Sequence, residues 1–143
     1  KGVDSTKRVS SAKLGPGATI VIKEKIMTHG HQTAETSFDV SLDGAGSSAK
    51  LISRSVARDF SRQLFRSKII GNTDCYGHSE CDAIIMDNGV VAAEPEIIAN
   101  HVDASLVHEA AIGKIAGDQL VKLMTLGLTE KEAEAQIING FLK

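Results

Sequence analysis

The chain contains 143 residues, of which 42% are hydrophobic and 24% are charged, and its formal net charge is −2. This length and composition predict one globular domain that can bury a sizeable core. The balanced charge excludes a globally basic surface for nucleic acid or a membrane. The longest apolar runs fall far short of the ~20 residues that a membrane-spanning helix needs. Only 3% of the residues are aromatic, and a core of aliphatic side chains favours parallel sheets and solenoids.

The first residue of the chain and its two cysteines bear on how complete the chain is and where the protein is located. The chain begins with Lys1, and we expect the natural N-terminal part to be truncated. Cys75 and Cys81 lie close together in the sequence and make a poor disulfide framework. A reducing cytoplasm is therefore the predicted location.

Residues 18–111 read as short strands separated by turn residues. In residues 36–43, Phe38, Val40 and Leu42 share one face, which predicts a strand with that face buried. The other predicted strands are residues 18–26, 50–57, 64–70, 81–86 and 90–93.

One segment, residues 54–66, fits two structures. Four arginines recur every four residues: Arg54, Arg58, Arg62 and Arg66. This spacing is typical of one face of a helix. The alternative is two strands that break at Arg58-Asp59, and the neighbouring strands favour it. The arginines are predicted to be solvated rather than to bind nucleic acid, because acidic residues balance them and stacking aromatics are absent.

The periodicity changes towards the end of the chain. Residues 118–126 have the spacing of a helix, which Gly127 ends as a C-terminal glycine. Thr129 and Glu132 have the spacing of a capping box that begins a second helix. A β body followed by a helical hairpin is the predicted architecture.

This architecture divides the chain into a β core in residues 1–112 and a helical segment in residues 113–143. Many short strands with a Val/Ile-rich core fit either an open sandwich or a β-solenoid. The turns are unevenly spaced and no hexapeptide repeat is present. These features argue against the acyltransferase type of β-helix, but not against solenoids in general.

The thiol of Cys81 is a candidate for chemistry. In a strand, Glu80 and Asp82 point to the face opposite Cys81, so their charges are expected to spare the thiol a rise in pKa. The alternative is a buried cysteine that acts as a small hydrophobic side chain. Cys75 is placed in a loop beside Gly77 as a candidate helper thiol.

The histidines offer nitrogen ligands but no complete metal motif. In a regular strand, only one residue of the pair His108-Glu109 can share a face with Cys81. His78-x-Glu80 begins a zinc deaminase signature, but the Pro-Cys-x-x-Cys that must follow is absent. Soft sulfur together with nitrogen and oxygen donors suits iron or transient sulfur.

Six short motifs occur in a specific order, three in the β body and three in the helical end. The β body ends with Gly71-Asn72, Glu80-Cys81-Asp82-Ala83-Ile84-Ile85-Met86 and His108-Glu109-Ala110-Ala111-Ile112-Gly113-Lys114-Ile115. The helical end carries Gly117-Asp118-Gln119-Leu120, Gly127-Leu128-Thr129-Glu130 and Ile137-Ile138-Asn139-Gly140-Phe141. From Gly71 to Leu142 this order resembles the C-terminal core of the SufB/SufD family, and the preceding strands are compatible with it.

Members of that family assemble iron–sulfur clusters together with an ABC-type ATPase, SufC. The resemblance implies a right-handed parallel β-helix, C-terminal helices that dock the ATPase, and pairing with a second SufB/SufD-type subunit. By motif position, Cys81 resembles the SufB cysteine that accepts sulfur and supports the nascent cluster. His108 and Glu109 resemble the pair in the family's His-Glu-Ala segment. SufD typically lacks the cysteine and the glutamate, so this chain is SufB-like.

The chain is shorter than a typical SufB and resembles a compact variety of the family, which makes a homodimer plausible beside a heterodimer. The leading hypothesis is a non-enzymatic scaffold that accepts sulfur and iron at a dimer interface. In this hypothesis the cluster is bound only transiently, and the protein can be isolated without it. The alternative is a SufD-like partner that dimerises and docks the ATPase without binding a cluster. A third hypothesis is a metal-dependent enzyme that uses the histidines.

Overall fold

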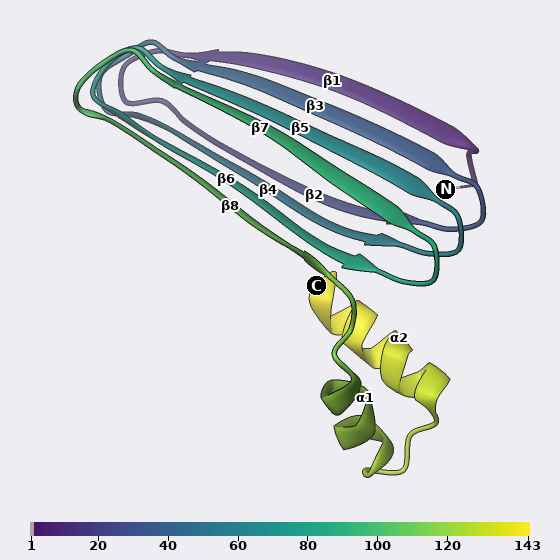
Figure 1. The fold of residues 1–143 in the computed structure, drawn as a ribbon. Helices are drawn as coiled ribbons and strands as arrows, with labels where there is room; N and C mark the ends of the chain where they lie inside the picture. The colour runs from purple at the N-terminus through teal and green to yellow at the C-terminus, as the bar shows by residue number, and fades with distance from the viewer. Residues whose placement is uncertain (1) are drawn as a thin grey trace.

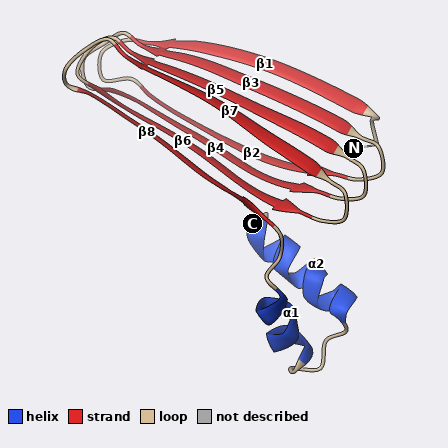
Figure 2. Cartoon of the chain, in the orientation of Figure 1, coloured by secondary structure: helices blue, strands red, loops and turns tan. Residues whose placement is uncertain are grey.

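Parallel strands followed by two helices make up the computed structural model, which describes residues 2–143 (Figure 1). Eight strands form two four-stranded sheets, in which each strand pairs with the strand two places away in sequence (Figure 2). Sheet A contains β1 (Ser5–Leu14), β3 (Thr33–Leu42), β5 (Arg62–Gly71) and β7 (Val90–Ala99). Sheet B contains β2 (Thr19–Thr28), β4 (Ser47–Ala57), β6 (Cys75–Ile85) and β8 (Ala104–Gly113).

The chain passes alternately through the two sheets, so one strand from each makes a turn of a β-solenoid of about four turns. In sheet A the paired positions are 5, 33, 62 and 90, a repeat of 28 or 29 residues. The predicted β-solenoid is confirmed. The repeat is a whole turn of two strands of ten or eleven residues each, so a search for a hexapeptide period does not find it.

Side chains alternate between the interior and the exterior along the strands. Phe38, Val40 and Leu42 point into the interior, as predicted, and each is at most 2% exposed. Phe65 of β5 packs edge-on against Phe38, with ring centroids 6.0 Å apart. Because a slip of one residue would turn this apolar face outwards, burial of these side chains specifies the register of the sheet.

Residues 54–66 form parts of two strands rather than a helix. The break between β4 and β5 falls at Arg58-Asp59, as predicted. Asp59 has a φ of 55°, a left-handed conformation through which a right-handed helix does not continue. The fourfold arginine spacing therefore does not define one surface, since Arg54 lies in sheet B and Arg66 in sheet A.

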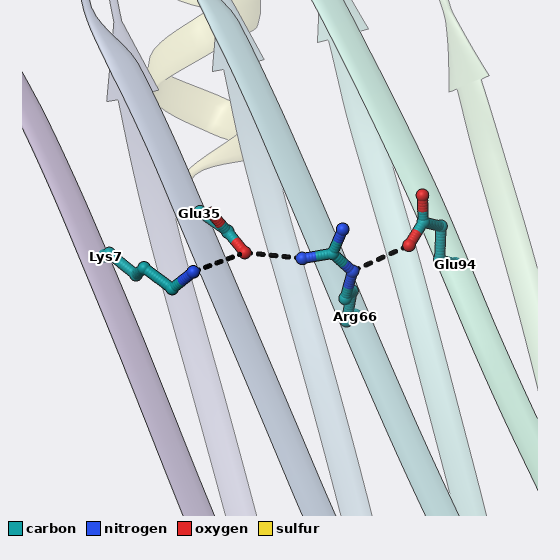
Figure 3. A network of polar contacts seen from close by, with 4 residues as sticks. All are labelled: Lys7, Glu35, Arg66 and Glu94. Carbon is teal, nitrogen blue, oxygen red and sulfur yellow. Dashed lines mark hydrogen bonds and ion pairs between the residues drawn. The ribbon is translucent and has the colours of Figure 1, made fainter.

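A ladder of charged side chains crosses the outer face of sheet A (Figure 3). Lys7 Nζ lies 3.2 Å from Glu35 Oε1, and Arg66 donates a hydrogen bond from Nη1 to the same oxygen. Arg66 Nε donates a second hydrogen bond to Glu94 Oε2 at 2.7 Å. Lys7 and then Arg66 hold the pKa of Glu35 below its ordinary value. Charges of alternating sign thus run across the sheet from β1 to β7.

Strand β1 was not among the predicted strands. Most of its side chains are exposed, and it pairs only with β3 among the described strands. An edge strand of this kind lacks the clear apolar alternation of the buried strands. Arg8 points inwards from β1, makes an ion pair with the buried Glu24 and lies over the ring of Phe38. It covers the interior at this end of the solenoid.

Both helices form where the sequence predicts them. The first, α1 (Gly117–Met124), is followed by Gly127 with a φ of 96°. The second, α2 (Glu130–Phe141), begins with a complete capping box. Thr129 accepts a hydrogen bond from the backbone of Glu132, and the Glu132 carboxylate accepts one from the Thr129 backbone. These bonds satisfy backbone groups that the first turn of a helix leaves free.

The helix α2 packs against the end of sheet B (Figure 1). Ile138 contacts a small apolar cluster that includes Val56 at the end of β4 and Met86 just after β6. Val56 occupies an outward position of its strand, yet it is fully buried because the helical segment covers it. Neither helix in residues 2–143 is long and apolar enough to cross a membrane.

Candidate functional site

Strand β6 presents different side chains to the inside and the outside of the solenoid. Cys81 is fully buried, and Ser79 before it is 1% exposed, so both point into the interior. His78 and Glu80 alternate with them and lie on the outer face, only partly exposed. The single segment that carries the predicted sulfur ligand therefore has two chemically distinct faces.

Cys75 begins β6 and does not lie in a loop, so that prediction was wrong. It pairs with Ser47 of β4, and its side chain is buried in the same core as Cys81. The loop-like glycine that follows serves packing instead. A Cβ at Gly77 would lie 2.7 Å from Leu106 Cδ2 and 2.8 Å from Ile69 Cγ2, so the glycine leaves room for these two side chains in the core.

The register between β6 and β8 places His108 and Glu109 on opposite faces. Ser79 pairs with His108, and Glu80 pairs with Glu109. Because Ser79 faces inwards, His108 shares the inner face with Cys81, whereas Glu109 shares the outer face with Glu80. The question that the sequence left open is thereby answered. The three predicted ligands do not meet on one face of this chain.

The Cys81 thiol lies in a poorly solvated interior. Burial, followed by the carboxylates of Asp82 and Glu24, raises its pKa to about 11. The expectation that the flanking acids spare the thiol was wrong for Asp82. An electrostatic field acts through the thickness of a strand, and the low polarity of the interior strengthens it. The thiol is therefore protonated at neutral pH and is a weak nucleophile in this conformation.

His108 follows Leu106 on the inner face of β8, and Leu106 packs against the main core. His108 Nδ1 is buried and has no hydrogen-bond partner among the described residues. Leaving such a nitrogen unpaired costs about 1–3 kcal/mol, so native proteins seldom do so without a reason. A thiol and an unpaired imidazole nitrogen on neighbouring strands suit iron or a sulfur-rich ligand.

The outer faces of β6 and β8 hold a second group of donors. One ligand atom each from His78, Glu80 and Glu109 lies within 4.8 Å of the other two. His78 Nε2 is 3.4 Å from Glu109 Oε2, but the two atoms are not aligned for a hydrogen bond. Burial, and then the neighbouring Glu80, raises the pKa of Asp82 above its ordinary value. Arg54 reaches only to 4.0 Å from both Glu80 and Asp82.

Sequence reasoning considered His78-x-Glu80 only as part of a zinc motif and did not connect it with Glu109. Alternation along β6 already places His78 and Glu80 on one face. The missing information was the pairing of β6 with β8, which brings Glu109 beside Glu80. His29 and His31 lie outside this group, in the turn between β2 and β3, where Gly30 has a φ of 58°.

Fold and side chains together define the class of this protein, a parallel β-solenoid that carries a thiol, imidazoles and carboxylates on the neighbouring strands β6 and β8. Residues 2–141 match the family model described as "SUF system FeS cluster assembly, SufBD core domain". The chain therefore belongs to the SufBD family of iron–sulfur cluster assembly proteins.

Several curated proteins support the same assignment. The chain is 39% identical over 105 residues to an iron–sulfur cluster assembly SufBD family protein of Methanothermobacter thermautotrophicus. The matched residues make up 72% of this chain and 26% of that protein. A SufBD family protein of Archaeoglobus fulgidus is 33% identical over 88% of this chain and 34% of its own length. One from Pyrococcus horikoshii is 35% identical over 92% of this chain and 40% of its own length. The chain thus spans between about a quarter and two fifths of these relatives.

Proposed function

We propose that this chain is the core of a scaffold subunit on which an iron–sulfur cluster is assembled, and that it does not itself catalyse a reaction. The observation that carries the proposal is that Cys81 of β6 and His108 of β8 lie on the same inner face of neighbouring strands, within a SufBD core domain. In this role Cys81 accepts sulfur, and His108 supplies a nitrogen ligand to the transient cluster. Glu109 joins them as an oxygen ligand when the site rearranges or meets a second chain.

The last turn of the solenoid supports pairing with a second subunit. Strands β7 and β8 each pair with one neighbour among the described strands, which leaves an unpaired edge on both sheets. Apolar side chains are exposed there, including Val102, Val107 and Ile112. One chain offers one candidate thiol ligand, Cys81, and one inner imidazole, His108, whereas a cluster takes about four ligands. A homodimer, or a heterodimer with a similar subunit, would double the set.

The helical segment supports a different contact. Val121, Met124 and Leu126 are exposed at or just beyond α1, although they are apolar. An apolar surface on a short helix that projects from the end of sheet B suits a protein partner. We assign this surface to an ABC-type ATPase of the SUF system, in the cytoplasm.

Loading of sulfur requires a change of conformation in this proposal. Cys81 is fully buried and its pKa is raised to about 11, so the closed form does not present a thiolate. Separation of β8 from β6 would hydrate the thiol, lower its pKa and expose His108 at the same time. A partner that moves the last turn is the natural source of this opening.

Anaerobic reconstitution with ferrous iron and sulfide tests the proposal in the complex with the ATPase. Cys81→Ser is expected to abolish cluster absorption, and Cys75→Ser is the matched control because both thiols are buried in the same core. Cluster formation in the Cys75→Ser variant shows that the core tolerates this exchange. Undiminished cluster formation by Cys81→Ser removes Cys81 from the role.

The second candidate function is a structural partner of the SufD kind. The burial of Cys81 among apolar side chains favours it, since a free cysteine in a core often serves only to fill space. Such a partner dimerises and binds the ATPase without a cluster. It is supported if the complex forms with Cys81→Ser, His108→Ala and Glu109→Gln variants while the unaltered protein yields no cluster signal.

A further inference from the structure

We propose that His78, Glu80 and Glu109 form a binding site for a divalent first-row transition metal on the outer face of sheet B. This site lies on the face opposite the inward-facing pair Cys81 and His108, and Glu109 is the one residue that it shares with the ligand set proposed above. One nitrogen and two carboxylate donors match Fe²⁺, Co²⁺ or Zn²⁺ better than Ca²⁺ or Mg²⁺, which prefer oxygen ligands only.

The backbone holds the three donors in place without help from loops. His78 and Glu80 are two residues apart on β6, so both project from the same face. Glu109 is the direct neighbour of Glu80 in the β6–β8 pairing. Parallel strands lie about 4.8 Å apart, which is the separation that lets three side chains converge on one ion. The ligand atoms already lie within 4.8 Å of one another.

His78 is the member of the group that lacks any other explanation. Its side chain is only 12% exposed, and Nε2 is buried without a hydrogen-bond partner among the described residues. The same atom lies 3.4 Å from the Glu109 carboxylate. A buried imidazole nitrogen that faces a carboxylate without bonding to it has the arrangement of two ligands around a vacant centre.

The charges around His78 also call for a cation. Glu80 and Glu109 occupy directly paired positions, where like charges repel each other. Asp82 adds a third carboxylate on the same face of β6. Arg54 is the nearest cationic side chain to Glu80 and Asp82, but at 4.0 Å it hydrogen-bonds to neither of them. A divalent ion bound to the three ligands would neutralise the pair.

The alternative is a simple ion pair between a protonated His78 and Glu109. That pair leaves Glu80 beside Glu109 with only the 4.0 Å contact to Arg54, so it accounts for two of the three donors. If iron is the cargo of this protein, the site would hold ferrous iron outside the solenoid while sulfur enters inside. This last step rests on the proposed function, whereas the metal site itself does not.

Titration of the purified, metal-free protein with Co²⁺ tests the site without sulfide or ATPase, so its outcome does not depend on cluster assembly. We expect one Co²⁺ per chain with visible bands of nitrogen and oxygen ligation and without a sulfur-to-cobalt charge-transfer band. His78→Gln and Glu80→Gln are each expected to weaken binding more than about tenfold. His101→Gln and Glu96→Gln are the matched controls, because both side chains lie on the surface away from the group, and they should bind Co²⁺ as the unaltered protein does.

Thermal unfolding gives a second readout that shows whether each variant is folded. Saturating Co²⁺ should raise the unfolding midpoint of the unaltered protein and of both controls, but not that of His78→Gln. The proposal is overturned by absent binding, by equal binding to His78→Gln, or by a charge-transfer band that places the metal on a thiolate.

Discussion

Sheet A and sheet B share one winding period, but they carry different chemistry. The strands of sheet A contain no cysteine or histidine, whereas β6 and β8 of sheet B carry both cysteines and two of the five histidines. On the outer face of sheet A, charges alternate in sign from Lys7 to Glu94 (Figure 3). On the outer face of sheet B, Glu80 lies directly beside Glu109. Each carboxylate of the sheet A ladder has a cation within hydrogen-bond distance or close to it, whereas Glu80 and Glu109 have only Arg54 at 4.0 Å and His78 at 3.4 Å.

The largest expected effect concerns the reactivity of the buried Cys81 thiol in sheet B. In a Cys75→Ser background, alkylation of Cys81 by iodoacetamide should be at least about 100-fold slower in the folded protein than in the unfolded chain near neutral pH. A rise in pKa from 9.0 to about 11 lowers the thiolate fraction by this factor, and burial slows the reaction further. Mass spectrometry of quenched samples gives the two rates. Equal rates would mean that the thiol is open to solvent.

Reversal of one charge should make sheet A resemble sheet B. Arg66→Glu places three carboxylates in a row with Glu35 and Glu94, so we expect a clear fall in the thermal unfolding midpoint. Arg66→Gln, which removes the cation without adding an anion, should lower the midpoint less. High salt should restore part of the loss in Arg66→Glu, because it screens exposed charges. A midpoint that does not respond to the reversal would show that the ladder has no part in stability.

The same substitution on the two sheets should have opposite signs. Glu35→Gln removes a carboxylate that two cations hold, and it should destabilise the protein slightly. Glu80→Gln removes a carboxylate whose paired neighbour is Glu109, and in chelator it should stabilise the protein by about 0.2–1 kcal/mol. Urea unfolding of both variants beside the unaltered protein measures the two changes. The comparison between the sheets fails if both variants shift the midpoint in the same direction.

The smallest expected effect is a difference in the response to pH. The pKa of Glu35 is lowered, so its contribution to stability is present above its ordinary value of 4.5 and is lost as the pH falls through the folded-state pKa. The pKa of Asp82 is raised above 3.8, so protonation in acid favours the folded state and offsets part of that loss.

Unfolding midpoints in chelator between about pH 3 and pH 6 should reveal both signs. Glu35→Gln should flatten the loss of stability in acid, and Asp82→Asn should steepen it. A steeper loss of stability in acid for Glu35→Gln would contradict the lowered pKa of Glu35.

Local patterns predicted most of the fold. The face formed by Phe38, Val40 and Leu42, the strand break at Arg58-Asp59 and the capping box at the second helix are all present. Each of these depends on residues that are close together in the sequence. β1 was missed because an edge strand with mostly exposed side chains carries little apolar alternation.

The candidate site was harder to predict because it depends on pairing across a whole turn. Cys81, His108 and Glu109 were found from motif order, but their faces follow from a register that no local pattern contains. Glu24 raises the pKa of the Cys81 thiol from two strands away, and Ser53 of β4 lies in register between the two residues. The group of His78, Glu80 and Glu109 on the outer face likewise depends on the pairing of β6 with β8.

His108 and Glu109 are neighbours in the sequence, and their side chains point to opposite faces of β8. One peptide bond separates an imidazole on the inner face from a carboxylate on the outer face. An extra residue inside the strand before His108 would exchange the two, placing a carboxylate against Cys81 and an imidazole against Glu80. Since β8 has a neighbour on one side only, it is held less firmly than an inner strand. The number of residues in β8 therefore decides which side chain faces each side as much as the residue types do.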